Sequence, residues 1–443
     1  MDSKRTLTMI EKDGNLTKKK KFFKGKIFDS MSGVPLLGWL FGILIAVLLE
    51  HFAGDLLVGV LGLPKIPVLF GFVIMLKKPL MIPGAMGYVL LIYILPISIV
   101  ARMSCEPANR VAAKLLDYPM FVSVLIHIAL LYASLYIWSE ISAYRVLTLK
   151  LTLIAIILTL SLNVVNGYMG EFSCSHPGFM ALGAYGASVF TVLFFANDKI
   201  FGHPILSPGL GPFMFPFALI VGGIVAALGA LVIAIPSFRT RGDYLAIISL
   251  AFLFIVKSMI ENLEVVGGPR GLSSQPDYAG LPTVFMWTVA CIWITNNFVR
   301  STFGKALNAV RDDEMAADAM SVNTRRTKMV AFLFAAFWAG VAGGLFAHVL
   351  RYVNPGTFGL QKLAEVLAMV YFGGLNSVYG SIVGAVSLSL LGEALRPLEI
   401  FKWIIIPLLL ILVMIYRPTG LIAFKEFNVE KLIKPKQRPG KEV

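Results

Sequence analysis

The chain has 443 residues, of which 57% are hydrophobic and 14% are charged, and its net charge is +14. Soluble domains are about 45–50% apolar and about 25% charged, so a soluble fold of this length could not cover its apolar surface, and a membrane protein is indicated. The positive charge does not indicate nucleic-acid binding, because Lys and Arg gather at the chain ends and in short loops between apolar runs, as in membrane proteins. The three cysteines show no CxxC pairing, so neither a disulfide framework nor a metal site is expected.

The chain opens with a basic stretch over residues 1–33, with six lysines at Lys18, Lys19, Lys20, Lys21, Lys24 and Lys26. Such a cluster favours the cytoplasmic face, where anionic lipid is present. A second basic tail, over 426–443, ends the chain. Both termini are therefore expected in the cytoplasm.

Long apolar runs fill the sequence between these tails. A helix needs about 20 mostly apolar residues to cross a bilayer. This predicts an all-α, polytopic transmembrane bundle of about 10–12 spans. The candidate spans are 34–52, 55–76, 86–102, 119–139, 146–166, 178–196, 214–236, 243–261, 280–299, 328–350, 363–395 and 402–417.

Basic loops predict two broken or re-entrant segments. The loop 300–328 is rich in Lys and Arg and is expected in the cytoplasm. The span 328–350 then leaves the cytoplasm, and the last span, 402–417, must begin outside for the C-terminal tail to be cytoplasmic. Residues 363–395 must therefore begin and end outside, so they must fold back, with Gly373 and Gly374 as the natural break. Taking Arg145 as cytoplasmic, 146–196 must cross once although it holds enough apolar sequence for two passes, which predicts an unwound piece over 166–178. Broken helices expose backbone N–H groups that can hold a substrate carboxylate.

The loop 300–328 has the pattern of a short amphipathic helix. Ala306, Val310, Met315 and Met320 are expected on its apolar side. A helix lying on a membrane surface would be rich in Lys and Arg on its polar face. This one is acidic in its middle, which favours docking against a protein.

Four stretches resemble the LivM-type permeases of branched-chain amino acid ABC importers, and the resemblance covers roughly residues 146–425. They are LNVVNGYMGEFSCSHPGFMALGAYGA at 162–187, RTRGDYLAIISLAF at 239–252 with VGGPRGL at 266–272, RDDEMAADAM in the loop, and LAMVYFGGLNSVYGSIVGA at 367–385, with RPTGL at 417–421 resembling the end of the family. The predicted domains are a basic N-terminal tail (1–33), an accessory transmembrane region (34–145), the permease core (146–425, with the coupling loop 300–328) and a basic C-terminal tail (426–443).

The resemblance implies a role and partners. The chain is expected to translocate branched-chain amino acids across the inner membrane beside a second, LivH-like permease, above two cytoplasmic ATPase subunits, with a periplasmic substrate-binding protein delivering the amino acid. The chain lacks a G-x-x-x-x-G-K-[ST] motif, so the partner ATPases, and not this chain, are expected to use ATP. Neither a bound cofactor nor a catalytic residue is expected. The residues expected to couple to the ATPases are Arg311, Asp312, Asp313, Glu314, Ala316, Ala317 and Ser321.

A substrate pathway is expected along the predicted breaks and the stretches that resemble the family. Its residues are Asn163, Gly167, Gly170, Glu171, Gly183, Tyr185, Gly267, Gly268, Gly373 and Gly374. Glu171 is the one carboxylate among them, and two roles stay open for it: a partner for a substrate ammonium group, or an ordinary loop carboxylate.

The chain departs from the family at three places. Ser321 stands where the family usually has Gly, Arg270 stands where it commonly has Asn, and Leu253-Phe254 stand where it often has an acid. Three alternatives stay open: the same architecture carrying urea, short amides or other amino acids, a non-transporting membrane scaffold, and a membrane-embedded enzyme. The last is disfavoured because the spans hold no cluster of His, Cys, Asp and Glu in catalytic spacing.

Overall fold

The computed structural model describes residues 33–62, 82–197, 202–238, 244–396, 399–417, 419–425 and 427–435. The N-terminal lysine cluster, the start of the stretch 239–252 and the last residues of the C-terminal tail lie outside these ranges. Among the described residues, eight helices are long and apolar enough to span a membrane, and two shorter apolar helices accompany them. This is the polytopic all-α bundle that the sequence predicts.

The described chain divides into two compact units. One draws on residues 33–62, 82–142 and 428–435, and the other on 143–396, 399–417, 419–425 and residue 427, without 198–201 and 239–243. We describe each unit by itself.

The first unit is a small helical bundle. Its helices are α2 (Leu36–Leu61), α3 (Ile82–Val89) continued by a π-helical turn (Leu90–Ile94) and α4 (Leu95–Met103), α5 (Cys105–Leu116), α6 (Met120–Glu140) and the short α18 (Val429–Ile433). The sequence predicts two spans, 34–52 and 55–76. Helix α2 instead runs unbroken through the predicted gap to Leu61, and the second predicted span from residue 63 on lies outside the described residues. Helix α2 is unbroken because nothing in its sequence stops the helix before Gly62, whose φ of +61° ends it. The amphipathic helix α5 was not predicted.

A buried carboxylate joins the helices of this first unit. Glu50 of α2 is 3% exposed and accepts hydrogen bonds from the hydroxyl groups of Tyr88 (2.8 Å) and Tyr93. Trp138 of α6 donates its indole N–H to the Tyr93 hydroxyl at 3.2 Å. A charged group in an apolar bundle is costly unless it is hydrogen-bonded, and this network supplies the bonds.

The second unit holds the remaining helices and one short sheet. The helices are α7 (Ala143–Asn163) with the π-helical turn η4 (Val164–Met169), α8 (His176–Phe195), α9 (Gly211–Ser237), α10 (Tyr244–Asn262), α11 (Leu281–Arg300), α12 (Thr302–Asp312), α13 (Glu314–Ala319), α14 (Thr324–Leu350), α15 (Leu360–Gly373), α16 (Val378–Ala394) and α17 (Glu399–Tyr416), with 3₁₀ turns at Pro208–Leu210, Glu264–Val266, Gly268–Arg270 and Pro355–Phe358. Strands β1 (Leu272–Ser273) and β2 (Tyr352–Val353) pair antiparallel, with Leu272 opposite Val353.

Small residues bring α8, α9 and α14 into close contact. A β-carbon on Gly183 of α8 would lie 2.2 Å from the α-carbon of Gly340 on α14, and one on Gly222 of α9 would lie 2.6 Å from the Gly183 carbonyl oxygen. Such spacing leaves room for glycine alone. Helices in lipid associate through close packing rather than through a hydrophobic driving force, so these glycines define the centre of the second unit.

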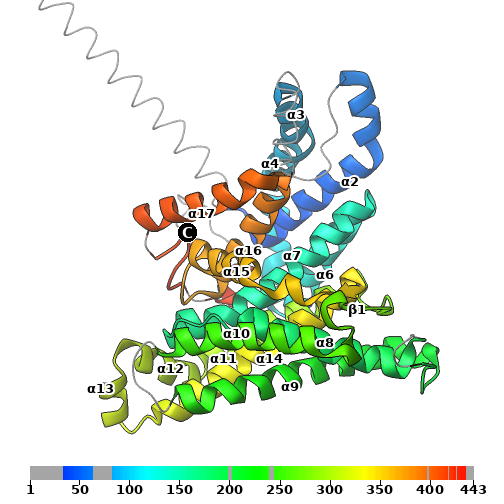
Figure 1. Cartoon of the computed structure of the whole chain (residues 1–443). Coiled ribbons are helices and arrows are strands. Elements are labelled where there is room, and N and C mark those ends of the chain that lie inside the picture. Colours follow the sequence, from blue (N-terminus) through cyan, green and yellow to red (C-terminus); the bar gives the residue numbers. More distant parts are fainter. Residues whose placement is uncertain are drawn as a thin grey trace, which may run out of the picture. The chain divides into compact units, whose positions relative to one another are not determined.

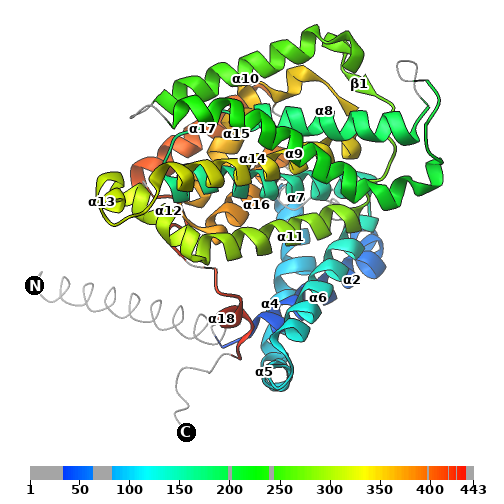
Figure 2. The same cartoon turned by 90° about the horizontal axis from the view of Figure 1, so that it is seen from below.

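The helices of this unit have two distinct ends. Figures 1 and 2 show α12 and α13 at one end and β1 at the other. We call the first the coupling end, because it carries the predicted coupling segment. Glu171, which follows α7, forms an ion pair with Lys328 at the start of α14, so α7 runs toward the coupling end. Along α8 and α14, Phe179 contacts Phe332 and Thr191 contacts His348, so α8 runs away from it.

This arrangement corrects the predicted topology of residues 146–196. They form two helices of spanning length and not one interrupted pass. Arg145 therefore lies at the opposite end from the coupling loop, although the sequence analysis placed both on one side. The reason is that Arg145 is 1% exposed: a buried arginine is held by its own contacts and does not mark a cytoplasmic loop.

The predicted reversal in 363–395 is confirmed. Helix α15 ends at Gly373 and α16 begins at Val378. The two helices fold back on each other so closely that a β-carbon on Gly384 would lie 2.1 Å from the Met369 carbonyl oxygen. We call this pair the re-entrant hairpin.

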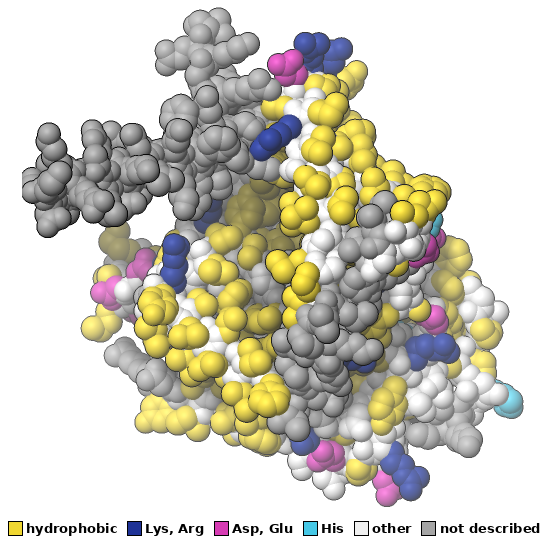
Figure 3. Space-filling model, turned by 90° about the horizontal axis from the view of Figure 1, so that it is seen from above, with side chains coloured by type: hydrophobic (Ala, Val, Ile, Leu, Met, Phe, Trp, Pro, Cys, Tyr) yellow, Lys and Arg dark blue, Asp and Glu magenta, His cyan; other side chains and the backbone are white. Residues whose placement is uncertain are grey.

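The outer surface of the described helices is apolar. On the face in Figure 3, hydrophobic side chains predominate and charged ones are few. Large apolar side chains project outward from several helices, including Phe213 of α9, Ile247 of α10 and Ile415 of α17. An apolar exterior is stable in the hydrocarbon of a bilayer and not in water, so these helices are those of a multi-pass membrane protein.

Candidate functional site

Two capped helices, α12 and α13, form the predicted coupling segment. The Ser301 hydroxyl accepts a hydrogen bond from the Gly304 N–H (3.3 Å), which caps the start of α12. The Asp313 carboxylate accepts bonds from the N–H groups of Met315 (2.9 Å) and Ala316 (3.0 Å) and caps α13. These bonds satisfy N–H groups that have no partner within their own helices. The sharp bend at Asp313 turns α13 away from α12.

Helix α13 presents an exposed apolar surface. Met315 and Met320 are 74% and 80% exposed, beside the exposed Glu314, whereas Ala317 is buried. The sequence analysis grouped Val310 with the two methionines on one apolar side. That grouping is wrong, because Val310 faces inward while the methionines face outward, on either side of the bend. Exposed methionines on a short helix are typical of a surface that contacts another protein.

Ser321 ends α13 in the left-handed conformation, with φ of +65°. The Val322 N–H donates to the Ala317 carbonyl oxygen at 3.1 Å across this turn. Glycine adopts positive φ without steric cost, and other residues do so at a penalty. This geometry gives a physical reason for glycine at this position in the family that the chain resembles.

Lys328 connects three elements at the coupling end. Its ammonium group lies 2.7 Å from Glu171 Oε1 and 2.8 Å from Glu314 Oε2. The Lys328 side chain is 11% exposed, against 24% for Glu171 and 49% for Glu314. One lysine on α14 thus joins α13, the predicted coupling helix, to the segment between α7 and α8. Glu171 is here a loop carboxylate paired with a lysine.

Arg311 makes a second connection to the same segment. Its Nη1 donates to the Gly167 carbonyl oxygen at 3.4 Å, its guanidinium holds the neighbouring Asp312, and it lies over the Phe424 ring. Gly170 has φ of +77°, and a β-carbon there would lie 2.4 Å from Arg311 Cγ. Gly170 is therefore required both by its backbone conformation and by the side chain packed against it.

Asn163 joins the two breaks. Its amide nitrogen donates to the Ser377 carbonyl oxygen (3.0 Å) and to the Ser381 hydroxyl (2.7 Å), and its oxygen accepts from the Asn376 N–H at 3.1 Å. Asn163 is 1% exposed and immediately precedes the π-helical turn of α7. One buried amide therefore holds the tip of the re-entrant hairpin against the unwound end of α7.

The segment after α17 completes the tip of this hairpin. The N–H groups of Leu421 and Ile422 donate to the carbonyl oxygens of Phe372 (3.1 Å) and Gly373 (2.9 Å). A helix leaves its last carbonyl groups without partners, and these bonds supply partners for two of them at the end of α15. Leu421, the last residue of the RPTGL stretch, is thus a structural part of the hairpin tip.

The other residues of the predicted substrate pathway make contacts within the protein. Gly183 lies against Gly340 in the helix packing, and the Tyr185 hydroxyl donates to the Val353 carbonyl oxygen at 3.3 Å. Gly267 and Gly268, with φ of +88° and +51°, form a turn at the end opposite the coupling segment. Their role in a substrate pathway stays a prediction.

The position of the acid often found in the family is occupied by packed and exposed apolar groups. Leu253 is buried against Cys174 and Leu363, while Phe254 is about half exposed on the outside of α10. An apolar pair suits both environments.

Sequence reasoning missed Lys328, Ser381 and the 421–422 segment as parts of this site. The sequence offers one signal, a lysine at the start of an apolar span, since such a charge needs a partner. Its partners lie 157 and 14 positions away, so the sequence does not identify them.

Comparisons with known proteins find relatives that match the part of the chain that holds these residues. A family model described as the permease component of branched-chain amino acid transport systems matches residues 144–415. The high-affinity branched-chain amino acid transport system permease protein LivM of Escherichia coli is 32% identical over 307 residues, which cover 61% of this chain and 68% of that protein. The protein of the same name from Salmonella typhimurium gives the same identity and coverage.

A more distant relative extends this similarity. The probable branched-chain amino acid transport permease protein LivM of Methanocaldococcus jannaschii is 23% identical over 257 residues, which cover 52% of this chain and 73% of that protein. No solved structure matches the chain. The family match begins one residue after the start of α7 and ends within α17, so it coincides with the second unit.

Proposed function

We propose that this chain, which belongs to the permease-component family of branched-chain amino acid transport systems, is the membrane-spanning subunit of an ATP-driven importer and carries branched-chain amino acids across the inner membrane. It would work beside a second, LivH-like permease, above two cytoplasmic ATPase subunits, and receive its substrate from a periplasmic binding protein. The ATPases would bind and hydrolyse ATP, and both termini of this chain would be cytoplasmic.

The Lys328 bridge is the observation that best supports this role. A coupling helix is useful only if its displacement reaches the transmembrane helices. Glu314 lies in the first turn of α13, Lys328 in the first turns of α14, and Glu171 between α7 and α8. Because one ammonium group binds both carboxylates, a movement of α13 is expected to pull on three transmembrane helices together.

Arg311 and Asn163 extend this path into the bundle. Arg311 on α12 holds the π-helical turn of α7 through the Gly167 carbonyl group. Asn163, at the other end of that turn, holds the tip of the re-entrant hairpin. Closure of the ATPases would press on α13, move the end of α7 and shift the hairpin, which would change access to the translocation path.

Uptake by the assembled importer tests this function. The chain, a second permease, two ATPases and a binding protein encoded beside it would be reconstituted in liposomes with labelled substrates. We expect saturable, ATP-dependent uptake of leucine, isoleucine and valine. Uptake of urea or acetamide alone would favour the alternative substrates, and assembly without any uptake would favour the scaffold.

A charge reversal on the coupling helix tests the role of α13. Glu314→Arg places a positive charge next to Lys328 on the exposed surface of α13, and we expect loss of co-purification with the ATPases or hydrolysis without uptake. Asp277→Arg is the matched control, because Asp277 is an exposed acid near the opposite end of the bundle. Normal coupled uptake by the Glu314 variant would contradict the assignment.

A further inference from the structure

A cavity of about 120 Å³ lies within the second unit, away from the coupling residues. Helices α7, α15 and α16 provide most of its wall, and α8, α14 and α17 complete it. A water-sized sphere occupies about 10–15 Å³ by this measure, so the cavity has room for a molecule of roughly ten non-hydrogen atoms. That is the size of a small amino acid.

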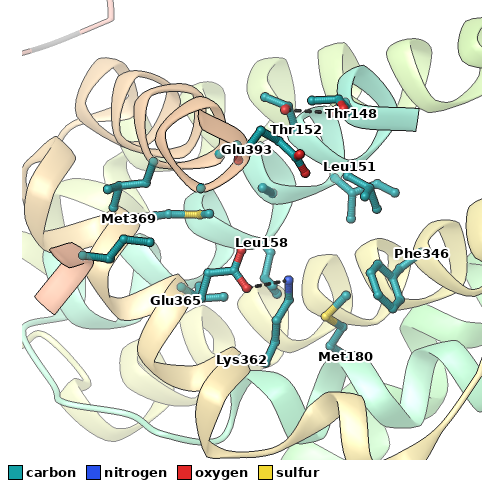
Figure 4. A pocket seen from close by; sticks show the side chains of 17 residues that line it. Thr148, Leu151, Thr152, Leu158, Met180, Phe346, Lys362, Glu365, Met369 and Glu393 are labelled. Atoms are coloured by element: carbon teal, nitrogen blue, oxygen red, sulfur yellow. Dashed lines mark hydrogen bonds and ion pairs between the residues drawn. The ribbon is translucent and has the colours of Figure 1, made fainter. Parts of the chain in front are cut away.

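Charged groups of both signs reach into this cavity. Lys362 and Glu365 of α15 are joined at 3.1 Å, and Glu393 of α16 faces the cavity from another wall (Figure 4). The side chains are 18%, 38% and 25% exposed, respectively. Ionisable residues in a membrane bundle are costly and mark functional sites by default. Here a cation and two anions line one space.

Lys362 and Glu393 can each form more hydrogen bonds than their neighbours in the structure provide. Lys362 has three donors, and its described contacts are Glu365 and the ring of Phe346, 5.6 Å away. Glu393 accepts from the Tyr144 hydroxyl and lies 3.7 Å from Arg396. A carboxylate has about four acceptor positions, so Glu393 can accept further donors from within the cavity.

Most of the other side chains that line the cavity are apolar, and the polar ones are Thr148, Thr152 and Ser389. Met180 of α8 and Phe346 of α14 lie on the side of the cavity away from Glu393, and Leu151 and Leu158 of α7 line it as well (Figure 4). Methionine is flexible and packs against apolar groups of varied shape. A ligand with one positive group, one negative group and a branched apolar tail would match both parts of the wall.

We propose that this cavity binds an aliphatic amino acid as its zwitterion, with Lys362 taking the carboxylate, Glu393 taking the ammonium group, and the side chain lying among Leu151, Leu158, Met180 and Phe346. This site rests on the proposed import function, because it would lie on the translocation path. It is separate from the two breaks where the sequence analysis expected the substrate, and where Asn163 and the N–H groups of Leu421 and Ile422 bond to other groups of the protein.

The test places a thiol in the cavity wall of the assembled importer. Ser389 lines the cavity, and Ser389→Cys changes its size little. The native cysteines at positions 105, 174 and 291 are buried. A small thiol-specific methanethiosulfonate reagent would be applied in liposomes, with and without leucine. We expect saturating leucine to slow labelling at least tenfold, and 4-methylpentanoate and 3-methylbutylamine, which each lack one charge, to have little effect.

Charge-neutral variants assign the two charged groups. In the S389C background, Lys362→Met and Glu393→Gln should each abolish protection by leucine. Lys257→Met is the control, because Lys257 forms an ion pair with Glu261 on α10 outside the cavity, and protection should persist. S258C, exposed on α10, should react at the same rate with and without leucine.

The results for the cavity can be distinguished from the results for the proposed import function. Unreactive S389C, unchanged labelling in leucine, full protection in Lys362→Met or Glu393→Gln, or equal protection by the one-charge analogues would overturn the site. If wild-type liposomes still import leucine in those cases, the cavity fails while the function stands. If they import none, the function fails as well.

Discussion

Lys328 and Glu171 form a 2.7 Å ion pair across 157 positions of sequence. The same ammonium group holds Glu314 of the coupling helix at 2.8 Å. Isolated ion pairs on a protein surface contribute little to stability. The Lys328 pair differs from these because the Lys328 side chain is mostly buried. In addition, its two carboxylates belong to segments that have no other ion pair between them among the described residues. Its removal would therefore disconnect α13 from the turn between α7 and α8.

Lys328→Met should uncouple the importer. The substitution keeps most of the length of the side chain but leaves Glu171 and Glu314 facing each other without a cation, which should lower the free energy of unfolding by about 1–3 kcal/mol. We expect leucine uptake to fall at least tenfold while ATP hydrolysis continues. Lys305→Met, at an exposed position on α12, is the control. Uptake equal to wild type in Lys328→Met would exclude the bridge from coupling.

Gly170→Ala should destabilise the second unit for two reasons that can be separated. Positive φ costs a non-glycine residue about 1–2 kcal/mol, and the new β-carbon would also lie 2.4 Å from Arg311 Cγ. Gly202→Ala meets the same φ cost, since its φ is +79°, but has no atom within 4 Å. Thermal unfolding of the detergent-purified chain should show a loss of about 2–4 kcal/mol for Gly170→Ala and about half as much for Gly202→Ala.

Shortening the neighbour tests the steric part. Arg311→Ala in the Gly170→Ala chain should recover some of the lost stability, because it removes the clash and leaves the φ cost. Equal melting temperatures for the two glycine variants would mean that Arg311 does not pack against Gly170.

The sequence predicted the reversal at Gly373 because hydropathy and basic loops can be counted along the chain. The same count failed at Arg145, since it treats every arginine as a loop anchor and cannot see that this one is buried. The break after Asn163 was expected, but as an interruption within one pass, where the structure has two full helices. Hydropathy shows how long each apolar run is. Where the chain turns within such a run depends on the helices that pack against it.

The coupling segment was predicted from its acids, and its contacts were not. Asp313 could be read as a helix cap from local sequence, and it is one. The pairing of Lys328 with Glu171 and of Asn163 with Ser381 depends on how distant helices meet. The sequence indicates that Lys328 needs a partner, but tertiary packing decides which residue that partner is.

Asn163→Leu should weaken the hold on the re-entrant hairpin. The variant fills similar space but leaves the partly buried Asn376 N–H without its acceptor and the Ser377 carbonyl oxygen with one donor fewer. A buried polar group left without a partner costs about 1–3 kcal/mol, so a loss of roughly 2–4 kcal/mol is expected in thermal unfolding. Asn262→Leu, whose amide bonds an exposed carbonyl group one turn earlier on α10, should change stability little. A similar loss in both variants would contradict the role of Asn163.

Ser321→Gly should stabilise the chain. Ser321 has φ of +65° in the turn that ends α13, and glycine adopts this conformation without the steric penalty of a β-carbon. Glycine also has more freedom in the unfolded chain, which offsets part of the gain, so the free energy of unfolding should rise by about 0.5–1 kcal/mol. Ser258→Gly, within helix α10, has no such gain and should lose about 0.5 kcal/mol. Thermal unfolding would compare the two, and co-purification with the ATPases should be unchanged in Ser321→Gly, because the turn keeps its shape. A melting temperature lowered by Ser321→Gly would show that the serine side chain contributes more to this turn than its backbone strain costs.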